Sequence, residues 1–309
     1  MEKNWDVIVA GGGAAGLSAA LMLGRSRRRV LVIDAGSPRN RFAEHMHGVL
    51  GQEGVAPRDL LARGRAEAAE YGVELVEGRI DRVQEHEGVL EVVAVDGTVR
   101  SARALVVATG LTDELPDIPG LAERWGSTVL HCPYCHGWEV RDQCLGVLVH
   151  SPLGLHQAEL IRQWSDRVTV LADPDLLGPD VTRRLRSRGV EFVTEPVAEI
   201  LGDAPQITGV RLGSGQEVPL DAIFTAATPR PHDEFLAPLD LARNETPFGS
   251  FLEVSPMGAT SHPRVWAIGN VVNPGANVPI SIGAGAFTGG AVNAALVAED
   301  LDLAVADAG

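Results

Sequence analysis

The strongest constraint on the fold lies in the first 35 residues, where glycines at a fixed spacing join two strands to a helix. Residues 6–10 form an apolar strand, residues 11–16 read Gly-Gly-Gly-Ala-Ala-Gly, and residues 30–34 form a second apolar strand ending in Asp34. This order of strand, G-x-G-x-x-G turn, helix and acidic strand end is typical of dinucleotide-binding folds. The turn lets a pyrophosphate approach the backbone at the helix N-terminus, and the carboxylate accepts from a ribose hydroxyl. We therefore expect a dinucleotide site here.

A second unit of the chain repeats this α/β pattern. The length of 309 residues leaves room for two domains of about 150 residues each. The second strand–helix–strand unit spans residues 145–171, but its turn reads His150-Ser151-Pro152 where a nucleotide site has glycines. Pro152 has no N–H to offer a phosphate, and the neighbouring side chains obstruct close approach. We expect an α/β protein with two Rossmann-like nucleotide-binding-fold domains, of which the second has lost the binding chemistry.

Composition argues against several classes of partner. The formal net charge of −15 disfavours nucleic acid and anionic membrane surfaces. No run of the sequence reaches the roughly 18–20 consecutive apolar residues of a membrane span. The chain has three cysteines and no export signal, which predicts a cytoplasmic protein.

Two of the three cysteines, Cys132 and Cys135, form a C-x-x-C motif within His-Cys-Pro-Tyr-Cys-His-Gly-Trp-Glu. Such a pair holds a metal, forms a structural disulfide or cycles between dithiol and disulfide. A cysteine zinc site needs two further ligands, usually from a second C-x-x-C, and the sequence has none. A structural disulfide would close only a very short loop and would constrain little of the unfolded chain. The redox interpretation is therefore favoured, and no metal site is expected.

Histidines flank the motif on both sides. Thiol–disulfide exchange needs a thiolate, and a helix N-terminus with nearby imidazoles lowers a cysteine pKa. His136 is our first candidate for the base, because an imidazole can take a proton near neutral pH. His131 is the second candidate. The alternative is that both histidines only hydrogen-bond the loop.

Four motifs occur in a fixed order along the whole chain. They are the G-x-G-x-x-G turn, Ala108-Thr109-Gly110, the C-x-x-C, and Ala267-Ile268-Gly269-Asn270. In this order the chain resembles low-molecular-weight thioredoxin reductases. The resemblance implies a thioredoxin reductase-like fold of two domains of the three-layer ββα type, and a homodimer. It also implies an FAD domain split into residues 1–113 and 244–309, around a central domain of residues 114–243.

The same resemblance implies which residues bind FAD. The ADP half would contact the glycine turn and the end of the second strand, with additional contacts just after it. The ribityl and flavin side would contact the Ala-Thr-Gly and Gly-Asn motifs, and the flavin edge would approach the residues before the last helix. The predicted residues are Gly11, Gly13, Ala14, Ala15, Gly16, Asp34, Arg39, Asn40, Thr109, Gly110, Gly269, Asn270, Asn277 and Val278.

The chain departs from the reductases in three places. It lacks their glycine-rich NADPH turn and basic cluster, has His136 where they typically have Asp, and has Asn270 where they have Asp. The Cys-Pro-Tyr-Cys-His-Gly-Trp-Glu stretch, with Pro38-Arg39-Asn40 and His45-Met46-His47-Gly48, is similar instead to the dithiol oxidases that close disulfides in gliotoxin-, holomycin- and romidepsin-type natural products.

This closer resemblance implies electron flow from a small-molecule dithiol through the cysteines to FAD and then to O₂, giving H₂O₂. Cys132 would exchange with the substrate, and Cys135 would face the flavin. Two alternatives stay open. One is a reductase of protein disulfides with an unusual donor, ferredoxin or NAD(P)H, and the other is a flavoprotein redox sensor without turnover.

Overall fold

The structure, a computed structural model, describes residues 5–308, without the side chains of residues 152 and 153. The chain forms two compact units. Unit 1 contains the chain up to Arg41, Pro57–Thr112 and the chain from Pro229 onward, and unit 2 contains Phe42–Ala56 and Asp113–Thr228. The chain leaves unit 1 through β7 (Leu111–Glu114) and returns through β16 (Thr228–Pro231), and these two strands pair.

These units differ from the expected domain limits in two places. The return to unit 1 falls at residue 229 instead of 244, because Pro229 and Pro231 mark the crossing and the following 3₁₀ segment η3 (Glu234–Leu239) places Leu236 in the core of unit 1. The second difference is the segment Phe42–Ala56, which belongs to unit 2 although it interrupts unit 1 in the sequence.

Unit 1 is built on a seven-stranded sheet with the strand order β3-β2-β1-β6-β5-β4, and β19 also pairs with β6. A hairpin of β17 and β18 stands apart from this sheet. The elements are β1 (Trp5–Ala10), α1 (Ala14–Arg25), β2 (Val30–Asp34), α2 (Pro57–Glu70), β3 (Glu74–Glu77), β4 (Ile80–His86), β5 (Val89–Ala94), β6 (Val99–Val107), β17 (Arg243–Thr246), β18 (Gly249–Leu252), β19 (Val265–Ala267), η4 (Gly269–Val271) and α6 (Val278–Asp307).

Strand direction in this sheet decides where the loops meet. β1 pairs in parallel with both β2 and β6, and β19 pairs in parallel with β6. Their carboxyl ends therefore lie along one edge of the sheet, which is where α/β folds bind ligands. β5 pairs antiparallel with β4 and with the first half of β6, so these strands form the antiparallel part of the sheet. β19 pairs in parallel with the second half of β6. The sequence predicts a hairpin over residues 79–84 and 89–95, and the antiparallel pair of β4 and β5 confirms it.

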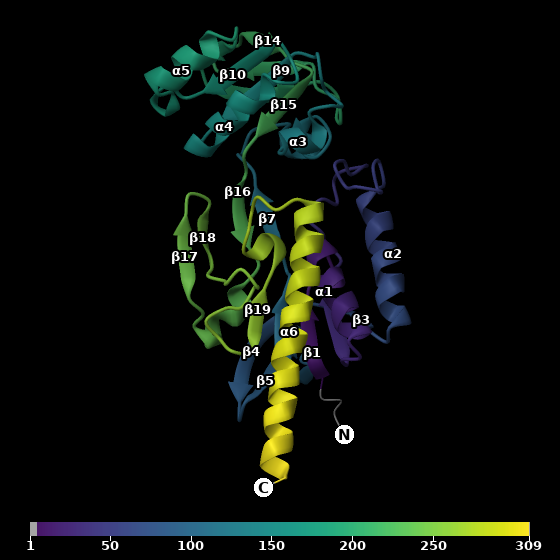
Figure 1. The fold of residues 1–309 in the computed structure, drawn as a ribbon. Coiled ribbons are helices and arrows are strands. Elements are labelled where there is room, and N and C mark those ends of the chain that lie inside the picture. The colour runs from purple at the N-terminus through teal and green to yellow at the C-terminus, as the bar shows by residue number, and fades with distance from the viewer. Residues whose placement is uncertain (1–4, 309) are drawn as a thin grey trace. The chain divides into compact units, whose positions relative to one another are not determined.

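The last helix, α6, lies against α1 over the sheet, as the yellow and purple ribbons of Figure 1 show. Close packing depends on Gly285, where a Cβ atom would lie 2.2 Å from the carbonyl oxygen of Ala15. The sequence predicts this helix over residues 279–296, but it extends to Asp307. By length and composition alone it could cross a membrane, contrary to the expectation that no segment is apolar enough. This is weak evidence, since core helices of soluble proteins pass the same test.

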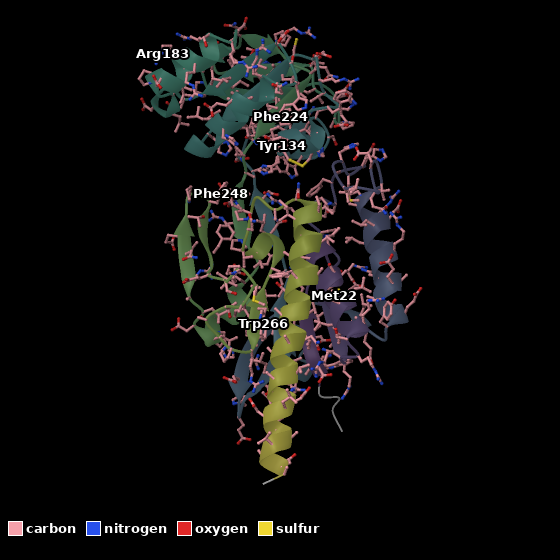
Figure 2. The ribbon with its side chains drawn as sticks, in the orientation of Figure 1. Met22, Tyr134, Arg183, Phe224, Phe248 and Trp266 are labelled. Atoms are coloured by element: carbon pink, nitrogen blue, oxygen red, sulfur yellow. A yellow bond between two sulfur atoms is a disulfide. The ribbon has the colours of Figure 1, made fainter. Side chains whose placement is uncertain are left out.

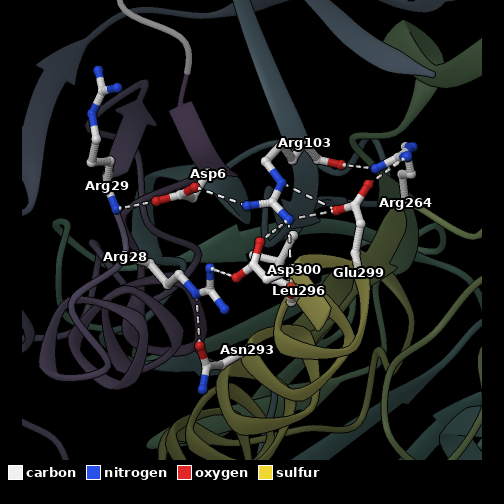
Figure 3. Close-up of polar contacts among 9 residues, drawn as sticks. All are labelled: Asp6, Arg28, Arg29, Arg103, Arg264, Asn293, Leu296, Glu299 and Asp300. Carbon is white, nitrogen blue, oxygen red and sulfur yellow. Dashed lines mark hydrogen bonds and ion pairs between the residues drawn. The ribbon is translucent and has the colours of Figure 1, made fainter. Parts of the chain in front are cut away.

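Charged side chains connect the C-terminal part of α6 to the sheet (Figure 3). The cluster contains Asp6, Arg28, Arg103, Arg264, Glu299 and Asp300. Arg103 is its centre: its guanidinium lies 2.8 Å from Glu299, 2.6 Å from Asp300 and 3.4 Å from Asp6.

We expect Arg103→Gln to lower the free energy of unfolding by about 1–2 kcal/mol, because three carboxylates lose their shared cation in a partly exposed network. Thermal unfolding at low and at high salt measures this, and salt should reduce the difference. A hydrogen bond from Arg264 holds the pKa of Glu299 below its usual value. This carboxylate therefore stabilises the fold above its ordinary titration range, and the contribution disappears as the pH falls through the lowered pKa. An unchanged unfolding temperature at low salt would mean that the cluster is not stabilising.

Unit 2 contains a five-stranded sheet with the order β11-β10-β9-β15-β8 and a three-stranded sheet with the order β12-β13-β14. All neighbours in the larger sheet are parallel, as the expected Rossmann-like fold requires. The elements are η1 (Ala122–Arg124), β8 (Val129–Leu130), α3 (Pro133–His136), β9 (Leu145–Val149), α4 (Pro152–Ile161), β10 (Val168–Ala172), η2 (Pro174–Leu176), α5 (Pro179–Arg186), β11 (Glu191–Val193), β12 (Val197–Leu201), β13 (Gly209–Leu212), β14 (Glu217–Pro219) and β15 (Ala222–Thr225).

Candidate active site

Cys132 and Cys135 form a disulfide in unit 2, at the start of the short helix α3. Cys132 is the N-cap residue, and its carbonyl oxygen accepts hydrogen bonds from the N–H groups of Cys135 and His136. The expected helix N-terminus is present, but α3 is a single turn, so its dipole is smaller than that of a long helix. Residues 5–308 contain no cluster of three or more possible metal ligands. Cys144 is a free, partly buried cysteine.

His136, the first candidate base, has a half-buried imidazole one residue after Cys135. Burial holds its pKa below the ordinary value of 6.5, because desolvation disfavours the charged ring. The carboxylate of Glu139 opposes this effect, whereas His47 and His131 add to it. The imidazole is therefore neutral at neutral pH and can accept a proton from a thiol.

His47, from the segment Phe42–Ala56, lies beside this helical turn within unit 2. Its Nδ1 lies 2.7 Å from Oε1 of Glu53, and its Nε2 lies 3.6 Å from Oε1 of Glu139. Glu53 also accepts from the N–H of Gly48 at 2.9 Å, and its pKa is lowered mainly by the hydrogen bond with His47. The His-Met-His-Gly stretch thus reaches the redox turn through His47, a role that sequence reasoning left open.

His131, the second candidate, is held by contacts that place it next to the cysteines. Gln157 donates from Nε2 to the carbonyl oxygen of His131 at 2.5 Å, and the His131 ring lies 6.3 Å from that of Trp125. Its charge acts on His136, as stated above. These contacts do not test which imidazole acts as the base, so the order of His136 before His131 stays a prediction.

All predicted cofactor-binding residues lie in unit 1. They follow the carboxyl ends of neighbouring parallel strands: Gly11 to Gly16 follow β1, Arg39 and Asn40 follow β2, Thr109 and Gly110 follow β6, and Gly269 and Asn270 follow β19. Asp34 ends β2, Asn277 is the N-cap of α6 and Val278 is the first residue of that helix. The fold therefore brings together segments that are far apart in the sequence, and their binding of FAD stays a prediction.

The glycine turn leaves room for a phosphate. Gly11 has φ of +103°, and a Cβ atom there would lie 2.4 Å from the carbonyl oxygen of Ala108. Gly13 caps α1 without a side-chain hydrogen bond, and no atom lies within 4 Å of the position of its missing Cβ. An open helix N-terminus with free N–H groups suits the pyrophosphate of a dinucleotide.

Asp34 forms an ion pair with Arg65 of α2, which sequence reasoning missed. The Nε of Arg65 is buried and has no hydrogen-bond partner within the described chain. A buried donor without an acceptor is costly, so this atom fits a site whose acceptor arrives with the ligand. The polar groups at this edge, a carboxylate that accepts and a guanidinium N–H that donates, are compatible with the ribose side of FAD. The pairing joins residues 31 positions apart, and a generic charged helix gives no sequence signal for it.

The turn after β6 is held by His232, a second residue that sequence reasoning missed. The hydroxyl of Thr109 donates to the carbonyl oxygen of His232 at 2.6 Å. The backbone N–H of His232 donates in turn to the carbonyl oxygen of Gly110 at 3.0 Å. The hydrogen of the Thr109 hydroxyl is thus already used within the protein. A cofactor at this turn would meet mainly backbone groups.

The hydrogen bonds of Asn270 explain why this chain has an amide where the reductases have a carboxylate. Its Nδ2 donates to the carbonyl oxygens of Asn273 at 3.0 Å and Ala276 at 2.9 Å. Arg39 donates to a third carbonyl oxygen of the same loop, that of Pro274, at 2.7 Å. Asn270 and Arg39 therefore shape the loop that leads to the N-cap of α6.

We expect Asn270→Asp to disturb this loop, because a carboxylate cannot donate and would face two carbonyl oxygens. Each lost hydrogen bond costs about 0.5–1.5 kcal/mol, and repulsion adds to that cost. The purified variant should therefore unfold at a lower temperature and retain less flavin than the wild type. Asn293→Asp on α6 is the control for introducing an acid outside this loop, because the oxygen of Asn293 accepts from Arg28 and an aspartate keeps that bond. Full flavin retention by Asn270→Asp would contradict this role of the amide.

The turn of unit 2 that corresponds to a nucleotide site lacks a glycine-rich sequence. His150 lies 3.4 Å from the hydroxyl of Thr225, and burial lowers its pKa. Gly154 packs α4 onto β9, since a Cβ there would lie 3.2 Å from Val149. Ser151 caps α4 without a side-chain hydrogen bond, and Pro152 follows it at the first helical position. This turn thus uses its one glycine for packing.

Comparison with known proteins shows which protein family the chain belongs to. The family model described as pyridine nucleotide-disulphide oxidoreductase matches residues 5–293. The chain belongs to this family. Members of this oxidoreductase family are flavoproteins, and the intact C-x-x-C makes this member a redox enzyme of thiols and disulfides.

Relatives within the oxidoreductase family cover nearly the whole chain. Thioredoxin reductase tcpT of Claviceps purpurea is 31% identical, over 95% of each chain. Thioredoxin reductase sirT of Leptosphaeria maculans is 28% identical, over 96% of each chain. The crystal structure of HlmI is 44% identical with a TM-score of 0.95, over 100% of this chain and 97% of that one. The oxidoreductase from Agrobacterium tumefaciens is 38% identical with a TM-score of 0.90, over 96% and 99%. The thioredoxin reductase-like fold and the family resemblance are confirmed.

Proposed function

We propose that the protein is an FAD-dependent dithiol oxidase that forms a disulfide in a small-molecule, natural-product dithiol, with O₂ as the electron acceptor. The dithiol loses two electrons and two protons, and O₂ gains both to give H₂O₂. Unit 1 supplies the residues predicted to bind FAD, and unit 2 supplies the Cys132–Cys135 disulfide.

One observation carries the direction of electron flow. The turn of unit 2 has His150, Ser151 and Pro152 in place of a glycine-rich turn, and its only glycine packs a helix onto a strand. A nicotinamide donor needs glycines that let its phosphates approach the backbone, and here the turn is not glycine-rich and Pro152 has no N–H to donate. The redox cysteines are intact, so the electrons of the pair are best supplied by the thiol substrate itself.

The residues of unit 2 account for the thiol chemistry. A substrate thiolate attacks the sulfur of Cys132, and the thiolate of Cys135 leaves. The neutral imidazole of His136 takes the proton from the substrate thiol. The second substrate thiolate then attacks the mixed disulfide, which releases the cyclic product and leaves Cys132 and Cys135 reduced. The residues of unit 1 would hold FAD, which would supply an acceptor for the electron pair of the two cysteines and a route to O₂.

The decisive test is an anaerobic titration of the flavin with a dithiol and with NADPH in parallel. We expect the dithiol to bleach the flavin and NADPH to leave it oxidised. In air, the dithiol should drive O₂ uptake with release of one H₂O₂ per disulfide formed. Bleaching by NADPH but not by any dithiol would refute the proposal.

A reductase of protein disulfides is the second candidate, favoured by the names of the tcpT and sirT relatives, which are both called thioredoxin reductase. It would take electrons from ferredoxin or NAD(P)H and pass them through the same cysteines in the opposite direction. Reduced ferredoxin that bleaches the flavin, followed by reduction of a protein disulfide, would support this candidate. A redox sensor, in contrast, would show no turnover with any donor.

We also propose that the protein acts as a cytoplasmic homodimer and that α6 contributes to the interface. Ile280, Phe287 and Leu301 are 51%, 60% and 64% exposed and are separated by multiples of seven residues. A seven-residue apolar repeat gives a helix one continuous face that can pair with a second helix.

Phe287→Glu or Leu301→Glu should therefore convert a dimer to a monomer, because each places a charge on that face. Light scattering coupled to size exclusion measures the mass. Phe248→Glu, at an exposed aromatic of the β17–β18 hairpin, should leave the mass unchanged. A dimer that persists in both α6 variants would place the interface elsewhere.

A further inference from the structure

Two exposed aromatic side chains belong to the segment of the redox disulfide, one between the two cysteines and one just after them. Tyr134 stands between the two cysteines and is 71% exposed, and Trp138 follows Cys135 by three residues and is 65% exposed. The N–H of Gly137 donates to the carbonyl oxygen of Pro133 at 2.7 Å, so the helical turn continues past α3. Residues four apart share one face of such a turn. Figure 2 shows Tyr134 on this turn, beside the yellow bond of the disulfide.

The ring of Trp138 is held in one orientation despite its exposure. The guanidinium carbon of Arg141 lies 4.1 Å from the ring centroid, a cation–π arrangement that covers part of one face. Arg141 also donates from Nη1 to the carbonyl oxygen of Trp138 at 2.7 Å. These two contacts fix the cation over the ring and so limit the rotation of the indole.

Tyr134 is held by a different contact. Its ring meets that of Trp164 edge to face, with centroids 5.7 Å apart and an angle of 86°. Trp164 can approach because position 137 is glycine: a Cβ atom there would lie 2.8 Å from the indole ring. Both exposed rings are thus oriented before any ligand arrives, which lowers the entropy lost on binding.

We propose that Tyr134 and Trp138 form an aromatic platform that binds the flat, apolar face of a small dithiol while its sulfurs exchange with the Cys132–Cys135 disulfide. This inference rests on the proposed function and names the class of substrate: a compact, planar ring system that bears two thiols. In the exchange, the substrate loses two electrons and two protons and becomes a disulfide, and the protein disulfide gains both and becomes two thiols.

The size of the platform favours a small molecule over a protein. Residues four apart span about 6 Å along a helix, enough for one or two fused rings. A stable protein interface buries about 800 Å² on each partner. The exposed residues that follow Trp138, namely Glu139, Arg141 and Asp142, are charged, so the apolar area does not continue in that direction.

The test compares two dithiols of similar chemistry but different shape. One is 1,2-benzenedimethanethiol, which has a planar ring, and the other is dithiothreitol, which has none. We expect Trp138→Leu and Tyr134→Leu to slow anaerobic flavin reduction by the aromatic dithiol about tenfold, equivalent to about 1.4 kcal/mol, and to change the rate with dithiothreitol by less than about twofold. Trp138→Phe should restore most of the loss. Phe248→Leu, an exposed aromatic in unit 1, is the matched control and should change neither rate.

A second readout does not depend on turnover. The alcohol 1,2-benzenedimethanol has the same ring but cannot exchange with a disulfide, and its NMR lines should broaden with the wild type and less with Trp138→Leu. Equal slowing of both dithiols, or equal binding of the alcohol by wild type and variant, would overturn the platform. Selective loss of activity toward reduced thioredoxin would overturn it in favour of a protein partner. Failure of the wild type to oxidise these two dithiols would count against the proposed function, and alcohol binding still decides the platform.

Discussion

Replacement of either redox cysteine, Cys132→Ser or Cys135→Ser, is expected to lower dithiol turnover at least about a thousandfold, because a serine can neither form nor accept a disulfide. The two cysteines form the only disulfide in residues 5–308, at the start of α3. Oxygen uptake with a dithiol measures the loss. Both variants should keep their flavin, since all predicted cofactor-binding residues lie in unit 1.

The same variants separate the roles of the two sulfurs. If Cys132 exchanges with substrate, its free thiol in Cys135→Ser should react rapidly with a small aromatic disulfide. The protein gains the mass of one half as a mixed disulfide, and the other half leaves as a thiol. Cys132→Ser should react slowly. The reverse order would assign the exchange to Cys135. Cys144→Ser is the matched control, because this free cysteine precedes β9, and its activity should stay within about twofold of the wild type. Equal loss in Cys144→Ser would mean that folding, not redox chemistry, limits the assay.

Local sequence patterns predicted much of unit 1 and of the redox turn. The G-x-G-x-x-G segment predicts its own strand, turn and helix, because each feature depends on residues only a few positions apart. The C-x-x-C motif likewise predicts a disulfide at a helix start, and both are present. The predicted cofactor residues follow parallel strands, so the sheet gathers them at one edge without further signals.

Contacts between distant segments were not predictable in this way. Arg65 pairs with Asp34, and His232 holds the turn at Thr109, 123 positions away. A charged residue in an amphipathic helix, or a histidine after a proline, looks the same whether or not it has such a partner. The segment Phe42–Ala56 shows the same limit: its histidines resemble a known motif, but only the fold shows that His47 lies between Glu53 and Glu139. Alignment of homologues, through residues that change together, is the signal that could reveal these pairs.

His136→Gln is expected to lower kcat/KM for a dithiol about 10²–10⁴-fold near neutral pH, the usual contribution of a general base. Burial holds the pKa of His136 below 6.5, so the wild-type imidazole stays neutral and active as a base to lower pH than an ordinary histidine. The rate of the wild type should therefore fall only below the ordinary titration range of histidine, and this fall should be absent from His136→Gln. His156→Gln, at an exposed histidine of α4, is the matched control and should reproduce the wild-type profile.

The neighbours of His136 give the sign of two further shifts. Glu139 raises the pKa of His136, so Glu139→Gln should move the acidic fall in kcat/KM to still lower pH. His47 lowers that pKa, so His47→Gln should move the fall to higher pH, in the opposite direction. Labelled histidine followed by NMR gives the pKa of His136 in the same variants without turnover, which separates electrostatics from a change in the rate-limiting step. Shifts of the pH profile in the same direction in Glu139→Gln and His47→Gln would show that the segment Phe42–Ala56 acts on the redox turn by position rather than by charge. A pH profile that is unaltered in His136→Gln would assign the role of base to His131.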